Sequence, residues 1–443
     1  MKIKKLLGSL IAGTAMLAIA GTASAVNYEA NIYGASAQFK FWNLLAADFI
    51  HNHDATNCAG VTVDHYDDGS AQGISKATCT NGDTYLIRVA SKASYDGILA
   101  LKGDASKAGT AACASGSTGD PGSTLRPYYR LMIDDTTCTG SGASMTCSNT
   151  ALKCARVNVA ASDVAGGSFK QISNGALKGP ASNGTTAYTT RSFSGINVTG
   201  LSADQEFVVP FAFFVNNQVT DSRLGTSTTM DNLTRLQAVL LFSAQVKNWQ
   251  QLGSVYPNLP TAICLRHAGS GTHATLDYAV VRGNGWGSNL PVTENNPADA
   301  DNYNSNLPIV YFNDGTGDET TCVNSNTVKD SSGADITVGA IGYADADLAV
   351  SSTNHTVSGK ANIREIKYQG EYALADAVKK GRYDFYTNEW AYKDSSLSGD
   401  TLTVVNAILT YAKSNVPTAE TDFWADTNSM SFTKATDQQY PHK

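Results

Sequence analysis

The eight cysteines of this chain limit its fold more than any other feature, because four disulfides would fix which distant segments lie side by side. Their number is even, and no C-x-x-C pair occurs that would indicate a zinc ribbon or an attached haem. The sequence leaves the connectivity open, and we predict it mainly from proximity along the chain. The predicted pairs are Cys58–Cys79, Cys113–Cys154, Cys138–Cys147 and Cys264–Cys322.

Residues 1–25 predict export to an oxidising compartment, where disulfides are the normal state of cysteine pairs. Lysines at positions 2, 4 and 5 precede an apolar stretch that runs to Ala20, and Ala23-Ser24-Ala25 is typical of a signal-peptide cleavage site. No cysteine follows this stretch that would carry a lipid anchor, and no later apolar run reaches the ~20 residues of a membrane span. We therefore expect a periplasmic or secreted bacterial protein with no membrane span in the mature chain.

The mature chain is acidic and long enough for two domains. Of the 443 residues, about 418 follow the predicted cleavage site. Three of the 32 Lys and Arg residues lie in the signal peptide, so 29 remain against 39 Asp and Glu, a net charge of −10. Such a chain lacks the basic surface that nucleic acid requires, and we expect no nucleic-acid partner. An anionic ligand must then be bound by a local arrangement of donors.

Strands alternate with helices along most of the sequence, which predicts an α/β fold. The continuous apolar run at 206–215 is typical of a strand that is buried on both faces. Asp231 is expected to cap a helix whose leucines share one face. The predicted strands are 28–33, 61–66, 155–161, 206–215, 262–266, 309–312 and 338–343, and the predicted helices are 37–51, 231–241, 271–281, 372–380 and 401–414.

Residues 79–155 are predicted to form a surface insertion, because their composition differs from that of the flanking segments. They include five of the eight cysteines and many Gly, Ser and Thr residues, and 103–122 is poor in large apolar side chains. These properties are typical of a subdomain held together by disulfides rather than by a large core. A strand near 128–133 is expected within it.

The segment Arg266-His267-Ala268-Gly269-Ser270-Gly271-Thr272 indicates function most strongly. A predicted strand ends at Arg266, and a turn of small residues opens a helix. The first N–H groups of a helix have no partner within it, and together with the helix dipole they attract anions. A guanidinium adds a fork of donors for a tetrahedral oxyanion. An ordinary capped helix start is the alternative interpretation of this segment.

Three other turns carry small hydroxyl residues at the ends of predicted strands: Gly34-Ala35-Ser36-Ala37, Gly69-Ser70 and Ser162-Asp163. Loops at the carboxyl ends of strands can converge on one crevice of an α/β fold. A carboxylate at Asp163 suits a ligand that still carries a proton, so it would favour phosphate over sulfate. Capping and turn formation are the alternative roles of these residues.

Taken in order, these motifs resemble those of the periplasmic phosphate-binding proteins of ABC transporters. The resemblance implies an α/β, two-lobed type II periplasmic-binding-protein fold with a two-strand hinge and a disulfide-rich insertion. It implies a first lobe of residues 26–208 plus 349–443 and a second lobe of 209–348. The similar segments span most of residues 30–350 outside the insertion, and they are Tyr33–Ala37, Ala160–Asp163, Val208–Phe211, Leu236–Trp249, Arg266–Thr272 and Ala340–Tyr343.

The same resemblance implies eight ligand-binding positions, four from each lobe. Ala268 stands where the family usually has an acidic residue, which leaves the identity of the oxyanion open. We expect no catalytic residue, no metal ion and no cofactor. The implied positions are Ser36, Ala37, Ser70 and Asp163 in the first lobe and Arg266, Ser270, Gly271 and Thr272 in the second.

These observations predict a monomeric solute-binding protein that is not an enzyme. It would capture inorganic phosphate or a similar oxyanion in the cleft between the lobes and deliver it to an ABC transporter permease. Two alternatives stay open at this point. One is an extracellular interaction protein that uses the cysteine-rich insertion, and the other is a phosphate-ester hydrolase that uses the same cleft.

Overall fold

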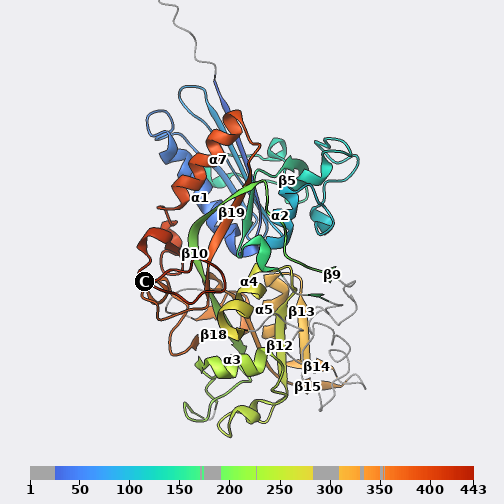
Figure 1. Cartoon of the computed structure of the whole chain (residues 1–443), viewed down its shortest axis with the longest axis vertical. Helices are drawn as coiled ribbons and strands as arrows, with labels where there is room; N and C mark the ends of the chain where they lie inside the picture. The colour runs from blue at the N-terminus through green and yellow to red at the C-terminus, as the bar shows by residue number, and fades with distance from the viewer. Residues whose placement is uncertain are drawn as a thin grey trace, which may run out of the picture.

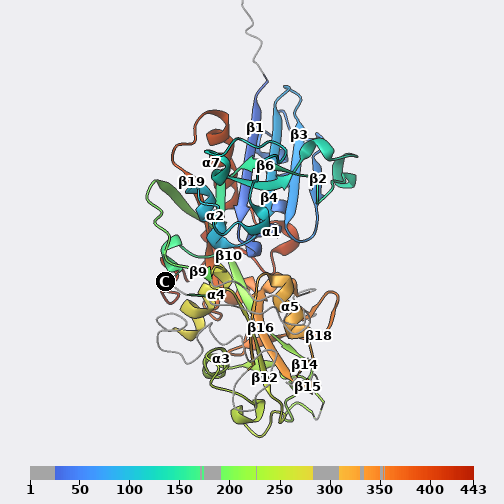
Figure 2. The same cartoon turned by 90° about the vertical axis from the view of Figure 1, so that its right-hand side faces the viewer.

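The computed structural model describes residues 25–169, 172–173, 191–225, 227–282, 309–329, 334–349, 353 and 355–443. The predicted signal peptide up to residue 24 and the polar stretch 283–306 lie outside these ranges. The molecule is elongated and has an upper and a lower part, with the C-terminus beside the junction between them (Figure 1). These two names refer to the orientation of Figures 1 and 2.

One mixed sheet runs through both parts. Its upper strands are β1 (Asn27–Gly34), β2 (Asp64–Asp67), β3 (Gln72–Thr78), β4 (Thr84–Ser91), β7 (Val159–Ser162) and β19 (Tyr386–Asp394). Its lower strands include β12 (Thr261–Arg266), β13 (Ile309–Asn313), β16 (Gly339–Asp345) and β18 (Lys360–Tyr368). With β10 (Leu201–Asn216) in the middle, the main path through the described strands is β13-β12-β16-β10-β19-β7-β1-β4-β3-β2.

Strand β10 belongs to both parts of the molecule (Figure 2). Residues 201–205 and 208–210 pair with β19, and the last residues of β10 pair with β16 and β18, all antiparallel. Residues 207–215 of β10 are buried, as the apolar run of the sequence predicts. A second connection returns from β18 through the helix α6 (Ala375–Lys379) to β19.

Helices cover both faces of the sheet in each part. In the upper part, α1 (Phe39–His53) and α7 (Gly399–Ala412) lie on one face and α2 (Ser94–Leu101) on the other (Figure 1). In the lower part, α5 (Thr316–Asn324) lies on one side, and α3 (Arg235–Phe242) and α4 (Gly271–Thr275) lie on the other (Figure 2). The largest cluster of buried apolar side chains continues from the upper part into the lower part. No helix in the described ranges combines the length and the apolar character that a bilayer crossing requires.

The structure confirms most of the predicted elements, and it corrects three of them. Helix α3 begins at Arg235 and is capped by Thr234, whose side chain and that of Gln237 form a reciprocal capping box, so the predicted cap at Asp231 is wrong. The predicted strand 155–161 is divided between β6 (Leu152–Arg156) and β7. The predicted strand 61–66 corresponds to the shorter β2.

The predicted insertion 79–155 begins too early. Strand β4, inside it, pairs in parallel with β1 over eight positions in the main sheet, and every residue of α2 is buried. The cysteine-rich part that stands apart from the main sheet follows α2 and contains the hairpin of β5 (Tyr129–Ile133) and β6. The composition of 79–155 is dominated by this later part, which hides the short core elements before it.

All four predicted disulfides are present: Cys58–Cys79, Cys113–Cys154, Cys138–Cys147 and Cys264–Cys322. The first three bridge segments of the upper part, and two of these lie in the cysteine-rich segment. The fourth joins β12 to α5 in the lower part. The predicted lobe boundary at residue 349 stays a prediction; beyond it, β18 pairs with the lower end of β10.

Candidate functional site

Six of the eight predicted binding residues lie at or after the carboxyl ends of parallel strands, where the upper part meets the lower part. In the upper part, β1 is parallel to β4 and to β7, so the loops after these three strands leave the same edge of the sheet. In the lower part, β12 is parallel to β13 and to β16. Side chains from these six loops can therefore converge on one place.

Three polar residues come from the upper strand ends. Ser36 follows β1 and opens the short helix η1 (Ser36–Gln38), and Ser94 follows β4 and opens α2. Asp163 follows β7 directly and is only 2% exposed. Its backbone N–H donates to Ser94 Oγ at 3.3 Å, and its backbone carbonyl accepts from Thr387 Oγ1 of β19. The backbone of Asp163 is thus fixed by contacts with α2 and with β19.

Arg266, the last residue of β12, is 1% exposed. Its Nη1 donates to Thr316 Oγ1 at 2.8 Å, and its Nη2 donates to the carbonyl of Asp314 at 3.3 Å. Its Nε has no hydrogen-bond partner among the residues that the structure describes. The guanidinium is therefore oriented from one side and keeps donor capacity on another.

Ser270, Gly271 and Thr272 open α4, as the sequence predicts. Ser270 is the N-cap, and its Oγ accepts from the backbone N–H of His273 at 3.4 Å. The helical path continues without a break into η9 (Leu276–Val281), so the N-terminus belongs to eleven helical residues. The first N–H groups of this run and its dipole face the same junction as Arg266.

Several contacts join the upper and lower parts at this place. Thr272 Oγ1 donates to Asp163 Oδ2 at 3.2 Å, and Ser36 Oγ lies 3.5 Å from Thr316 Oγ1. The backbone N–H of Tyr95 donates to the carbonyl of Gly269 at 3.3 Å. Lys92 Nζ donates to Asp314 Oδ2 at 2.9 Å. The two parts are therefore closed on each other around Asp163 and Arg266.

Gly271 permits this closure because it has no side chain. A Cβ atom built at Gly271 would lie 2.5 Å from Ser94 Oγ, 2.6 Å from Asp163 Cβ and 2.8 Å from Asp163 Oδ2. Cβ atoms essentially never lie this close to atoms to which they are not bonded, so a side chain at position 271 would force Ser94 or Asp163 to move. The glycine is thus required by close approach of the two parts rather than by its own backbone conformation.

Buried carboxyl groups surround Arg266. Burial raises the pKa of Asp163 to about 6, although Thr272 and Arg266 act in the opposite direction. Burial, followed by repulsion from Asp163 and Asp345, raises the pKa of Glu389 well above its usual range. Gln38 donates to Glu389 at 2.5 Å. Near neutral pH, Asp163 is therefore mostly ionised, whereas Glu389 holds its proton to a higher pH than an ordinary glutamic acid does.

Two of the predicted positions make no polar contact across the junction. Ser70 is exposed, and its hydroxyl donates to Asp68 within the same turn at 3.3 Å. Ala37 is buried in the middle of η1. The remaining predicted residues, Ser36, Asp163, Arg266, Ser270, Gly271 and Thr272, all lie at the junction.

Sequence reasoning missed Ser94, Thr316 and Glu389. Ser94 was hidden because its segment was assigned to the insertion, although it follows a strand in the same way as Ser36. Thr316 comes three residues after β13, so the predicted strand 309–312 could have located it. No local signal marks Glu389, which lies inside β19 and reaches the site only through packing.

Position 268 carries an alanine, and other groups orient Arg266. Ala268 is fully buried in an apolar cluster. Arg266 is oriented instead by Thr316 and by the backbone of Asp314. Glu319 and Asp345 lie near it, and burial raises the pKa of both carboxyl groups well above their usual range. The guanidinium of Arg266 is therefore held in place without an acidic side chain at position 268.

No protein-family model matches this chain. A putative phosphate ABC transporter substrate-binding protein with bound phosphate from Clostridium perfringens is 12% identical, covers 89% of this chain and 98% of its own, and has a TM-score of 0.43. A phosphate-binding protein from Stenotrophomonas maltophilia is also 12% identical, and the match covers 88% of this chain and 84% of that protein, with a TM-score of 0.41. An ABC-type phosphate transport receptor from Vibrio cholerae is 18% identical over 48% of this chain and 67% of its own, with a TM-score of 0.31. These likenesses concern the fold and do not identify a ligand.

Proposed function

We propose that this chain is an extracytoplasmic solute-binding protein that captures inorganic phosphate, or a closely similar oxyanion, between its upper and lower parts. The observation that carries the proposal is the convergence of Ser36, Asp163, Arg266 and Thr272, from four separate strand ends, on one buried junction. Donors from both parts would contact the same ligand, so the ligand would favour the closed arrangement. We further propose a monomer that delivers the anion to an ABC transporter permease.

Arg266 and the start of α4 are the proposed anion-binding groups. A guanidinium can donate two parallel hydrogen bonds to a tetrahedral oxyanion, and such charge-assisted bonds are stronger than neutral ones. Backbone N–H groups at a helix N-terminus add donors without adding net charge. The chain is acidic as a whole, which agrees with a local binding arrangement rather than general electrostatic attraction.

Asp163 is the proposed determinant of phosphate over sulfate. With a pKa of about 6, it is mostly ionised at neutral pH and would repel an anion that has no proton to donate. Hydrogen phosphate can donate its proton to this carboxylate, whereas sulfate cannot. Burial and the neighbouring carboxyl groups raise the pKa of Glu389 beside it, which favours the neutral form of Glu389 and so disfavours a second repulsive charge.

The arrangement of Ser270 and His273 supports binding rather than ester hydrolysis. Ser270 Oγ accepts from the backbone N–H of His273 and acts as a helix cap. The imidazole of His273 lies 2.6 Å from Tyr343 Oη through its Nδ1, and burial lowers its pKa to about 3. Ser270 thus has the environment of a structural cap and not that of an activated nucleophile.

Isothermal titration calorimetry of the mature chain with phosphate and with sulfate tests the proposal. We expect one phosphate per chain, weaker sulfate binding, and a tenfold to hundredfold loss of phosphate affinity in Arg266→Lys, which corresponds to about 1.4–2.7 kcal/mol. The matched control is Arg223→Lys, at an arginine whose side chain is 63% exposed. Absence of phosphate binding, or equal affinities in the two variants, would refute the proposal.

A further inference from the structure

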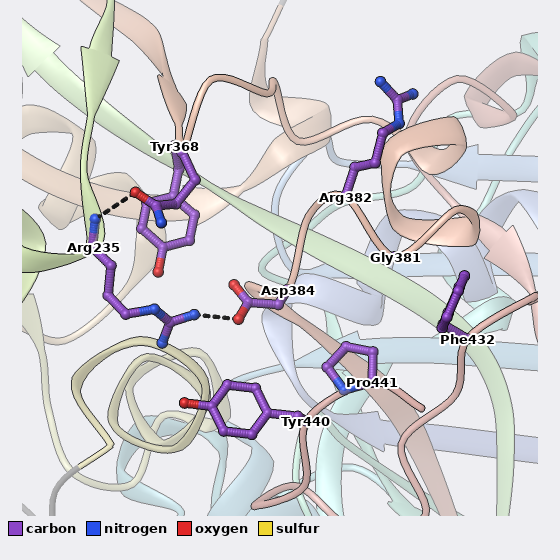
Figure 3. A pocket seen from close by; sticks show the side chains of 9 residues that line it. Arg235, Tyr368, Gly381, Arg382, Asp384, Phe432, Tyr440 and Pro441 are labelled. Atoms are coloured by element: carbon purple, nitrogen blue, oxygen red, sulfur yellow. Dashed lines mark hydrogen bonds and ion pairs between the residues drawn. The ribbon is translucent and has the colours of Figure 1, made fainter. Parts of the chain in front are cut away.

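A pocket lies where α3, the end of β18 and the segment before β19 meet the C-terminal residues (Figure 3). Its volume is about 320 Å³, at the small end of the range for small-molecule sites. None of the predicted oxyanion-binding residues lines it. Its walls include Arg235, Tyr368, Asp384, Phe432, Tyr440 and Pro441.

The hydroxyl of Tyr368 marks this pocket as more than a surface depression. Tyr368 is 1% exposed, and its Oη has no hydrogen-bond partner among the residues that the structure describes. Figure 3 shows the hydroxyl pointing toward the space between Arg235, Asp384 and Tyr440. A buried hydroxyl without a partner costs free energy, and a ligand acceptor placed there would remove that cost.

The pocket region carries more positive than negative charge. Arg235 forms an ion pair with Asp384 and donates to the carbonyl of Ala279 at 2.8 Å. Arg282 lies against the ring of Tyr440, with its guanidinium carbon 3.4 Å from the ring centroid. Arg282 donates to backbone carbonyls and, within the described ranges, pairs with no carboxylate, and its Nη2 has no partner there. The guanidinium of Arg282, next to the pocket, thus adds positive charge that no carboxylate in the described ranges pairs with.

The other side of the pocket is apolar. The ring of Tyr440, which is 59% exposed, stands beside Pro441, and Phe432 completes this wall (Figure 3). Arg382, at the rim, is already paired with Glu371 and Asp376, so it adds little net charge. One side of the pocket therefore suits an anionic group, and the opposite side suits a flat hydrocarbon surface.

We propose that this pocket binds a compact organic monocarboxylate, with its carboxylate toward Tyr368 and Arg235 and its apolar body against Tyr440, Phe432 and Pro441. A monoanion suits the unpaired positive charge that Arg282 brings to this region. A carboxylate accepts at once from a hydroxyl and from a guanidinium, which are the donors present. The site is independent of the proposed phosphate site, because the two share no residue.

Saturation-transfer NMR and calorimetry with benzoate, in phosphate-free buffer, test this site on the mature chain. We expect millimolar binding of benzoate, as befits so small a ligand, and at least tenfold weaker binding of its neutral analogue benzamide. Tyr368→Phe should weaken benzoate binding at least tenfold without affecting the fold, because it removes a hydroxyl that has no protein partner. Tyr66→Phe, on β2, is the matched control and should bind as the unmodified chain does.

Three results would overturn the proposal: no saturation transfer at about 10 mM benzoate, equal binding of benzamide, or unchanged benzoate binding in Tyr368→Phe. Should Tyr368→Phe fail to fold, Tyr440→Ala provides the same test, because the exposed ring of Tyr440 is removable without opening the core. Its expected effect is also a tenfold or greater loss. Phosphate titrations of the same variants should be unchanged, which separates a failure of this site from a failure of the phosphate site.

Discussion

Thr272 Oγ1 donates to Asp163 Oδ2 at 3.2 Å across the junction between the two parts of the molecule. Both residues are buried, and 109 positions separate them in the sequence. Burial raises the pKa of Asp163 to about 6, and the hydroxyl of Thr272 limits that increase because it stabilises the carboxylate. The charge of Asp163 is therefore coupled to the approach of the two parts.

Asp163→Asn should reduce the preference for phosphate over sulfate at least tenfold at pH 8. The amide cannot accept the phosphate proton as strongly as a carboxylate does, and it no longer repels sulfate. Calorimetric titration of each anion measures the ratio. Asp400→Asn makes the same chemical change at an exposed position of α7 and should leave the ratio unaltered. Parallel loss of both anions in Asp163→Asn would contradict the role assigned to this carboxylate.

Gly271→Ala should weaken phosphate binding at least tenfold, because the new methyl group would overlap Ser94 Oγ and Asp163 and hold the two parts slightly apart. Small-angle X-ray scattering with saturating phosphate should then give a larger radius of gyration than that of the unmodified chain. Gly317→Ala places a methyl group in open space on α5 and serves as the control. If the unmodified chain, Gly271→Ala and Gly317→Ala gave the same scattering and the same phosphate affinity, the close approach of Gly271 to Asp163 would be unnecessary for binding.

Glu206→Gln should stabilise the protein at alkaline pH. Glu206 lies on β10, fully buried, and neither carboxyl oxygen has a hydrogen-bond partner in the described part of the chain. Burial raises its pKa from 4.5 to about 8. Between these values the folded state keeps the proton that the unfolded state loses, so the free energy of unfolding falls as the pH rises.

The expected gain from Glu206→Gln is about 2–4 kcal/mol at pH 8.5 and close to zero below pH 4.5. Urea unfolding at both pH values measures it. Asp400→Asn, at an exposed carboxyl group, should show no such dependence on pH. A constant difference between Glu206→Gln and the unmodified chain across this range would mean that Glu206 titrates normally.

Loss of the Cys264–Cys322 disulfide should cost more stability than loss of Cys138–Cys147. The two bonds close loops of 58 and 9 residues, and loop-closure entropy predicts about 4 and about 2.5 kcal/mol, respectively. Paired Cys→Ala substitutions and urea unfolding measure both values. The first change should also weaken phosphate binding, because α5, which carries Thr316, is attached to β12 by this bond. The reverse order of stabilities would count against the entropic explanation.

Local sequence patterns were sufficient for several of the elements that carry the site. The apolar run of β10, the helical spacing in α1 and the small-residue turn after Arg266 each depend on interactions within about twenty residues. The disulfides were predictable because most of them join neighbouring cysteines. The core elements β4 and α2 were missed because they are short and lie beside a cysteine-rich segment whose composition dominates the window.

Which polar groups meet could not be read from local patterns. Ser36 and Thr316 lie 3.5 Å apart although 280 positions separate them, and Glu389 reaches Asp163 from a strand that has no polar motif of its own. Ser70 follows the same kind of turn as Ser36, yet its hydroxyl is bound within that turn by Asp68. Backbone preferences and apolar periodicity depend on residues that are close in sequence, so they can be predicted from the sequence. Convergence of donors, burial and the resulting pKa values depend on how the sheet brings distant strand ends together, and these arise only when the chain is packed.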